Sequence, residues 1–228
     1  MSFIVAIDGP AGTGKGTITK LIAKELGLVN IDTGAMYRCV TLQTLRKGIT
    51  TLEEKEKIIK IAKDIEITMK NESENQQIYL NGENVSKEIR SKEVSAFVSP
   101  VSSIPEVREI MVDLQRKMAQ NTDVIMEGRD ITTVVFPNAN VKIYLDASVE
   151  ERAKRRFKEN QEKGLNMTYE EVLEAIKTRD YNDMNKTVGA LKIADDAIIM
   201  DTTKLNIEQV KEQVKEVILK KLNTEKTE

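Results

Sequence analysis

The sequence predicts an α/β protein with a parallel sheet and helices on both faces, and three observations indicate this class. A continuous apolar run over residues 3–7 stops at Asp8, which is typical of a strand buried on both faces. Apolar residues then recur at helical spacing over 18–26, and a short apolar run follows over 28–31, so strand, helix and strand form one βαβ unit. Further strand-like apolar runs occupy 124–126, 141–145 and 197–201.

Residues 63–90 have a different pattern, which predicts a small β-containing insertion on a helical arm. Apolar positions change there from helical spacing to alternation, and Asn81-Gly82 is a strong signal for a two-residue hairpin turn.

Helices are expected around this insertion and after it. Pro105 fits the first position of a helix, and Ser148 fits the cap of a charged helix that runs to about Glu162. Helical spacing resumes over 168–183, and the last helix is expected to fray over 220–228.

Composition excludes several classes of protein. The chain has 228 residues, 40% of them hydrophobic, and 35 basic against 37 acidic residues give a net charge of −2, so no strong field attracts nucleic acid or membranes. The absence of histidine excludes Ser-His-Asp triads and histidine-based zinc sites, and a single cysteine excludes internal disulfides. Apolar runs stay far below the roughly 18 residues of a membrane span, and the N-terminus has no leader pattern. We therefore expect a cytoplasmic protein.

A glycine-rich segment between the first strand and the first helix predicts a phosphate-binding loop. It consists of Gly9, Pro10, Ala11, Gly12, Thr13, Gly14, Lys15, Gly16 and Thr17. A polyphosphate needs many backbone N–H groups directed at one concavity, and glycine lets the backbone approach closely. The following helix adds its N-terminal dipole, and Lys15 adds a positive charge for the β- and γ-phosphates.

The loop sequence also indicates how Mg²⁺ would be bound. The strict pattern has Ser or Thr directly after the lysine as a Mg²⁺ ligand, whereas this chain has Gly16 there and its hydroxyl one residue later, at Thr17. We expect Mg²⁺ to be held mainly by nucleotide oxygens and water, and we assign it no protein ligand. A GTPase is disfavoured because Asn185-Lys186-Thr187-Val188 lacks the aspartate of a guanine motif.

Several further motifs carry a family resemblance. The Gly-Lys-Gly-Thr variant of the loop resembles nucleoside monophosphate kinases, and so does the run Asp32-Thr33-Gly34-Ala35-Met36-Tyr37-Arg38. Gly128-Arg129-Asp130, followed by Thr133-Val134-Val135-Phe136-Pro137, is similar to a specific run of bacterial cytidylate kinases, and the segment from Lys142 through Arg156 is similar to the strand and lid helix that follow it there. The matches run nearly end to end, so the chain resembles the bacterial cytidylate kinase family of P-loop kinases.

The resemblance implies an architecture and an activity. One kinase unit is expected, with a core over about 1–36, 97–147 and 189–228, a nucleotide-monophosphate-binding arm and insertion over about 37–96, and a helical lid over about 148–188. The expected reaction is direct in-line phosphoryl transfer from ATP to CMP, and also to dCMP, with Mg²⁺. We expect no nucleic-acid or membrane partner, and a monomer.

The resemblance also implies site residues. The catalytic set is Lys15, Arg129, Arg152, Arg156 and Arg179, and the substrate-binding set is Thr33, Arg38, Ser99, Arg108, Arg129, Asp130, Arg179, Asp183 and Lys186. Arg38 and Arg129 would hold the acceptor phosphate, lid arginines would reach the transferring phosphate, and Asp183 would face the ribose. Thr33, Ser99, Arg108 and Asp130 would surround the cytosine and its sugar.

Two positions depart from the family pattern. Lys186 stands where the family often has arginine, which removes bidentate geometry, and Thr132 stands where it usually has glycine, which makes the backbone less free.

The residues also suit phosphoryl transfer when they are considered without the resemblance. The acceptor of such a kinase is a phosphate oxygen that is mostly ionised near pH 7, because its second pKa is about 6. No general base is needed, and catalysis consists of aligning two phosphates and neutralising charge, for which arginines are suited.

Simpler roles and other functions stay open at this point. Asp32 or Thr33 could merely cap a helix, and the arginines of 152–156 could form a solvated face in which Glu151 pairs with Arg155. The enzyme could instead phosphorylate UMP, AMP or a non-nucleotide alcohol on the same scaffold. A binding protein that uses ATP as a structural switch is the alternative from another class.

Overall fold

The computed structural model describes residues 2–72, 75–162 and 164–225. The chain divides into two compact units. Unit 1 comprises Met1–Asn30, Asn121–Lys186 and Ala190–Glu228, and unit 2 comprises Ile31–Gln120 with Thr187–Gly189. The narrower boundaries expected from the sequence for core, arm and lid stay a prediction.

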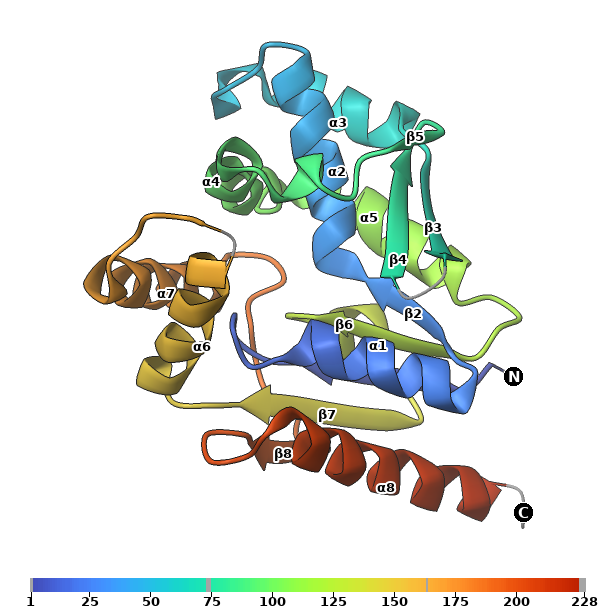
Figure 1. Cartoon of the computed structure of the whole chain (residues 1–228). Coiled ribbons are helices and arrows are strands. Elements are labelled where there is room, and N and C mark those ends of the chain that lie inside the picture. The colour runs from blue at the N-terminus through green and yellow to red at the C-terminus, as the bar shows by residue number, and fades with distance from the viewer. Residues whose placement is uncertain (1, 73–74, 163, 226–228) are drawn as a thin grey trace. The chain divides into compact units, whose positions relative to one another are not determined.

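A five-stranded sheet forms the centre of unit 1, and only its strand β2 extends past the unit boundary, at Ile31 (Figure 1). Its strands are β1 (Ile4–Asp8), β2 (Val29–Asp32), β6 (Val124–Gly128), β7 (Val141–Asp146) and β8 (Ile198–Asp201), in the order β2-β6-β1-β7-β8. β1 pairs in parallel with β6 and β7, and β7 pairs in parallel with β8. The predicted α/β class, a mostly parallel sheet with helices on both sides, is confirmed.

Two helices pack against this sheet through one apolar cluster. α1 (Lys15–Leu26) and α8 (Ile207–Glu225) contribute Ile22 and Val214, which lie with Ile7 and Ile143 of the central strands. Burying such side chains is the main favourable term that holds the helices on the sheet. α8 continues to Glu225, so the fraying predicted from residue 220 is wrong as far as that residue; 226–228 lie outside the described residues.

The lid segment forms a helical pair in unit 1. α6 (Val149–Glu162) and α7 (Tyr169–Met184) pack through Ala153, Val172 and Ile176. Ser148 has the expected capping contact, because its hydroxyl accepts from the Glu151 N–H, and Thr168 forms a reciprocal capping box at the start of α7.

Unit 2 combines helices with a small antiparallel sheet. The helices are α2 (Thr33–Arg46), α3 (Lys55–Asp64), α4 (Lys92–Val101) and α5 (Pro105–Met118), with short 3₁₀ turns at Leu52–Glu54 and Glu88–Arg90. The sheet consists of β3 (Ile67–Glu72), β4 (Asn75–Leu80) and β5 (Glu83–Asn84), which pair antiparallel. Asn81 and Gly82 both have positive φ, at 51° and 82°, so the predicted two-residue hairpin turn is confirmed.

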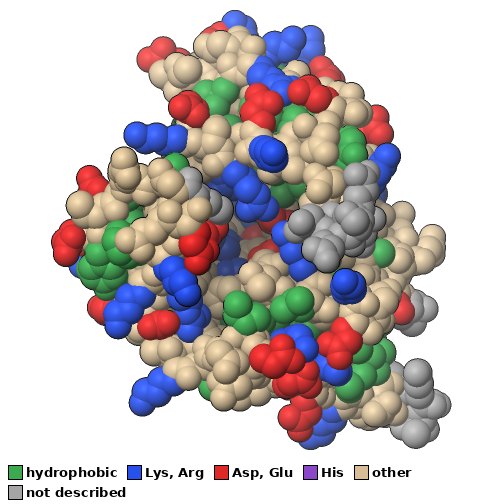
Figure 2. Space-filling model, in the orientation of Figure 1, with side chains coloured by type: hydrophobic (Ala, Val, Ile, Leu, Met, Phe, Trp, Pro, Cys, Tyr) green, Lys and Arg blue, Asp and Glu red, His purple; other side chains and the backbone are tan. Residues whose placement is uncertain are grey.

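Charged side chains of both signs are scattered over the visible surface. Figure 2 shows acidic and basic side chains interspersed on one face. Along α8 and its neighbour α1, for example, Lys211 pairs with Glu208, and Lys215 pairs with Glu25. This mixing agrees with the small net charge of −2.

Candidate active site

The phosphate-binding loop lies between β1 and α1, as the sequence predicts, and its glycines are required by the backbone. Gly9 has φ of 147°, and a Cβ atom at this position would lie 2.0 Å from the Leu145 carbonyl oxygen. Gly14 has φ of 90° and precedes the first residue of α1. Residues with side chains would be strained or would clash at these two points. The loop can therefore keep this shape only with glycine.

Lys15 is directed back into this loop. Its Nζ donates hydrogen bonds to the Gly9 and Pro10 carbonyl oxygens, each at 2.7 Å, and to the Thr13 hydroxyl at 3.3 Å. The side chain is 5% exposed, and burial together with the charge of Arg129 lowers the pKa of the Lys15 ammonium well below its usual value. Phosphate oxygens would compete with these neutral acceptors for the ammonium and would favour its charged form.

The Glu127 carboxylate lies against Gly16, the position that departs from the strict loop pattern. A Cβ atom on Gly16 would lie 2.8 Å from Glu127 Oε1, so Ser or Thr would displace this carboxylate. Among the described residues, no group of three or more acidic, cysteine or histidine side chains could hold a metal ion. The way in which Mg²⁺ would be held stays a prediction, and Glu127 is a carboxylate beside the loop that suits this ion.

Asp183 gathers three cations of the predicted site. Its Oδ2 accepts from Arg129 Nε at 2.8 Å and lies 3.8 Å from Arg179 Nε, and its Oδ1 lies 3.2 Å from Lys186 Nζ. Burial alone would raise the pKa of the Asp183 carboxyl, but these positive charges hold it below its usual value. One carboxylate therefore keeps together three cations that would otherwise repel one another.

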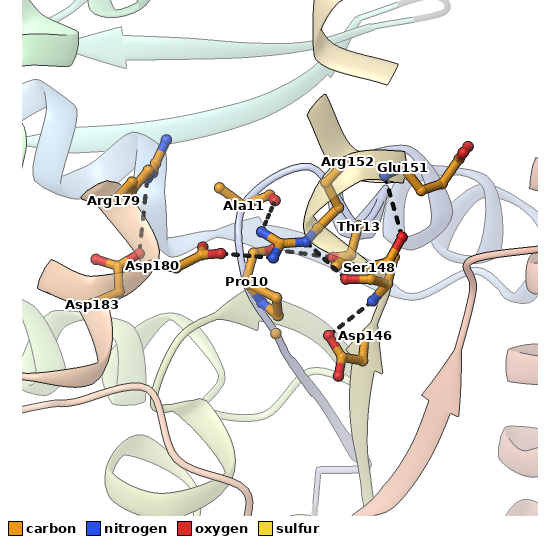
Figure 3. Close-up of polar contacts among 12 residues, drawn as sticks. Pro10, Ala11, Thr13, Asp146, Ser148, Glu151, Arg152, Arg179, Asp180 and Asp183 are labelled. Carbon is orange, nitrogen blue, oxygen red and sulfur yellow. Dashed lines mark hydrogen bonds and ion pairs between the residues drawn. The ribbon is translucent and has the colours of Figure 1, made fainter. Parts of the chain in front are cut away.

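Arg152 lies in the first turn of α6, and its side chain is buried rather than exposed on the helix surface. Figure 3 shows its polar contacts. Its guanidinium donates from Nε to the Ala147 carbonyl oxygen at 2.9 Å and from one terminal nitrogen to the Ala11 carbonyl oxygen at 3.1 Å. The other terminal nitrogen lies 2.7 Å from Asp180 Oδ2. To reach a phosphate, Arg152 would first have to break these contacts, so its predicted catalytic role stays a prediction.

The other lid arginines are in contact with solvent. Arg156 is exposed and pairs with Glu159 at 2.9 Å, and Arg155 pairs with Glu151 at 3.2 Å, which is the i,i+4 pair expected of a solvated helix face. Arg156 can change partners at low cost, because exposed ion pairs contribute little.

In unit 2, Arg38 and Arg108 are both held by neighbouring groups. Arg38 donates to the Ile89 carbonyl oxygen at 3.0 Å and to the Ser95 hydroxyl at 2.9 Å. Arg108 is 4% exposed and lies over the ring of Tyr37, 5.5 Å from its centroid. Such an arrangement fixes the plane of the guanidinium.

The remaining predicted residues of unit 2 lie at helix ends. Thr33 is the first residue of α2, where Asp32 accepts from the Ala35 N–H at 2.9 Å, so Asp32 has the simple capping role considered above. Ser99 lies in the last turn of α4, and its carbonyl oxygen accepts from the hydroxyls of Ser102 and Ser103.

Comparison with known proteins identifies the family. The family model for cytidylate kinase matches residues 5–220. The chain belongs to the cytidylate kinase family. A cytidylate kinase of Caldanaerobacter subterraneus subsp. tengcongensis is 51% identical over 95% of this chain and 94% of its own length. One of Fusobacterium nucleatum is 52% identical over 92% and 94%, and one of Caldicellulosiruptor bescii is 48% identical over 97% of each chain. An uncharacterized protein of Eubacterium ventriosum shares the fold, with 11% identity, a TM-score of 0.55 and coverage of 96% of this chain and 98% of its own.

Both departures from the cytidylate kinase pattern have partners in the structure. Lys186 lies against Asp183, where a single ammonium replaces the fork of an arginine. Thr132 donates from its hydroxyl to Asp8 Oδ2 at 2.7 Å. Thr132 restricts the backbone more than glycine would, but its hydroxyl adds a hydrogen bond that glycine cannot make.

Sequence reasoning missed several residues beside the site. The motif at 32–38 gives no separate role to Tyr37, the helical spacing over 168–183 gives none to Asp180, and the first apolar run indicates only that Asp8 ends a strand. Their roles depend on partners distant in the sequence, such as Arg152 for Asp180 and Thr132 for Asp8. Only the position of Asp8, directly before the glycine-rich loop, offered a signal.

Proposed function

We propose that this chain catalyses the ATP-dependent phosphorylation of CMP, and of dCMP, to the diphosphate by direct in-line transfer. The observation that carries the proposal is the cluster in which Asp183 holds Arg129, Arg179 and Lys186, in the same unit as the Lys15 loop. Such a group of cations suits the charge of two phosphates and of the phosphoryl group that passes between them.

The proposed mechanism uses alignment and charge. Lys15 and the loop N–H groups bind the β- and γ-phosphates of ATP, while Arg38 and Arg129 bind the acceptor phosphate. Arg156 and Arg179 reach the transferring group from the lid. Mg²⁺, when bound, would supply further charge neutralisation. The acceptor oxygen is already ionised, so a chain without histidine has the groups that the reaction needs.

We assign the choice of cytosine to Asp130 and Arg108. Cytosine presents an N4 amine as a donor, whereas uracil presents an O4 acceptor at the same place, so a carboxylate favours cytosine. Asp130 is buried, and its side chain does not cap the turn that follows it. Arg108 would donate to the N3 and O2 acceptors, and its stacking on Tyr37 favours one orientation. Thr33 and Ser99 would complete this site, with Asp183 at the ribose.

The proposal extends to the cellular setting. We propose that the enzyme acts in the cytoplasm as a monomer on CMP, dCMP and ATP, without a nucleic-acid or membrane partner. In the part of the chain that the structure describes, no helix is both long and apolar enough to cross a membrane.

The proposal is tested by ADP release in a coupled assay with CMP, dCMP, UMP, AMP and an alcohol as acceptors. We expect turnover with CMP and dCMP to exceed the rest, and Lys15→Ala to lower it by several orders of magnitude with little change in thermal melting. Lys24→Ala, an exposed lysine of the same helix, is the matched control and should behave as wild type. A preference for UMP, AMP or the alcohol would favour the alternative that this chain is a kinase for another small molecule on the same scaffold. ATP binding without any transfer would favour an ATP-dependent switch.

A further inference from the structure

Asp8 is a fully buried carboxylate that the mechanism above does not use. It is the last residue of β1 and has an exposed fraction of 0%. Its Oδ1 accepts from the Ile131 N–H at 3.0 Å, and its Oδ2 accepts from both the N–H and the hydroxyl of Thr132, each at 2.7 Å. Three hydrogen bonds therefore connect the end of β1 to a segment 123 to 124 residues further along the chain.

These hydrogen bonds cap an unusual turn. Residues Ile131–Val135 form a single turn of π-helix, and the first N–H groups of any helix have no partner inside it. Asp130 precedes the turn but its side chain does not cap it. Asp8 supplies the cap instead, so this turn depends on the strand that leads into the phosphate-binding loop.

The connection joins two parts of the proposed active site. Asp8 and Gly128 are register partners on the parallel strands β1 and β6, so the loop that starts at Gly9 and the segment that starts at Arg129 leave the sheet at the same edge. The charge of Asp8 acts on both cations there, because it raises the pKa of Arg129 and opposes the lowering of the pKa of Lys15.

The Thr132 hydroxyl is the one side-chain donor in this set. A residue without a hydroxyl at this position would still offer its N–H, but would leave Asp8 with two of its three hydrogen bonds. Burial raises the pKa of the Asp8 carboxyl, and the hydrogen bonds from Thr132 and Ile131 act in the opposite direction. The hydroxyl therefore helps to keep a buried negative charge in place.

We propose that Asp8 and the Thr132 hydroxyl form a positioning pair that aligns the phosphate-binding loop with the Arg129–Asp130 segment. The inference rests on the proposed function for the roles of Lys15 and Arg129. A displacement of about 1 Å between reacting groups can cost roughly 100-fold in rate. Loss of the hydrogen bond between Thr132 and Asp8 therefore lowers kcat, while each nucleotide alone still binds to its own half of the site.

Three variants of the turn test the pair. Thr132→Val removes the hydroxyl and keeps the shape, Thr132→Ser restores a hydroxyl, and Thr133→Val is the matched control. Thr133 lies in the same turn, and its buried hydroxyl has no hydrogen-bond partner among the described residues. We expect Thr132→Val to lower kcat about 10-fold while the Kd values of ATP and CMP, measured separately by calorimetry, stay within about 2-fold. Thr132→Ser and Thr133→Val should both stay close to wild type.

A second measurement does not depend on turnover. In the nucleotide-free protein, Thr132→Val should speed amide hydrogen exchange both in the turn and in the loop over residues 9–15, and Thr133→Val should speed neither. Two results would overturn the proposed positioning role: faster exchange that is confined to the turn, or an unchanged kcat of Thr132→Val in an enzyme that phosphorylates CMP. If the wild type does not phosphorylate CMP at all, the proposed function fails, and the exchange in the loop still decides the inference.

Discussion

Replacing Arg152 separates two roles that the sequence and the structure suggest for it. A catalytic lid arginine that reaches the transferring phosphate would affect turnover and leave folding unchanged. In the structure, its side chain is 4% exposed and pairs with Asp180, whose side chain is 10% exposed. Removal of one partner from a buried ion pair costs about 3–5 kcal/mol, since the other charge stays buried without compensation. The cost should be large at Asp180, because its other carboxylate oxygen, Oδ1, has no hydrogen-bond partner among the described residues.

The expected loss of stability is large enough to measure directly. For a domain of this size, 1 kcal/mol shifts the Tm by about 2–4 °C, so Arg152→Ala should melt roughly 6–20 °C below wild type. Arg152→Lys should recover only part of this loss, because an ammonium cannot reproduce three contacts made in one plane. Arg156→Ala is the matched control from the same helix, and it should melt within about 1 °C of wild type because its ion pair is exposed.

Thermal and urea melting of the four proteins, together with kcat and KM for ATP, distinguish the two roles. A double variant, Arg152→Met with Asp180→Leu, should regain most of the stability, because two apolar side chains leave no buried charge. If Arg152→Ala melts with wild type while its kcat falls by orders of magnitude, the structural argument fails and the guanidinium acts on the phosphate. A loss of stability without recovery in the double variant would place the cost in packing rather than in charge.

Two further predictions concern base choice and pH. Asp130→Asn should reduce the preference for CMP over UMP by about 5- to 150-fold, because an amide can offer either a donor or an acceptor; an unchanged ratio of kcat/KM values would mean that another residue reads the base. Asp183, whose pKa its cationic neighbours hold below the usual value despite its burial, contributes stability that is present above the unfolded pKa of about 3.9 and is lost as pH falls through the folded pKa. Urea melts from pH 7 to 3 should therefore show a flatter acid limb in Asp183→Asn, and parallel curves would contradict this.

The sequence predicted those elements whose signal is local. The β1 strand, the glycine loop and the Asn81-Gly82 turn each have their cause within a few residues, because burial on both faces and positive φ limit which residue types can stand there. The sequence offered a helix cap at Asp32 or Thr33 but gave no range for α2, which follows directly after a strand, and it assigned no helix over α4, which contains Pro100 in its last turn.

The contacts of the site residues could be predicted only in part. The sequence indicated that Arg129, Arg179, Asp183 and Lys186 belong to one site, and the structure brings these four together on one carboxylate. Arg179 and Lys186 stand four and three residues from Asp183, which is a local spacing, but the sequence could not show that Arg129 joins them, because hydrogen-bond partners 54 residues apart leave no periodic pattern.

Gly16 shows how one departure from a motif can follow from another part of the chain. The pattern alone suggested a weaker protein contribution to magnesium binding, and gave no reason for the missing hydroxyl. In the structure, Glu127 Oε1 lies 2.8 Å from where a Cβ atom on residue 16 would stand, at the end of the strand next to β1. Burial lowers the pKa of Lys15, and the charge of Glu127 opposes this lowering; the same charge contributes to the raised pKa of Arg129. The glycine that removes a hydroxyl from the loop therefore leaves room for a carboxylate that favours the charged form of Lys15 against the effect of burial.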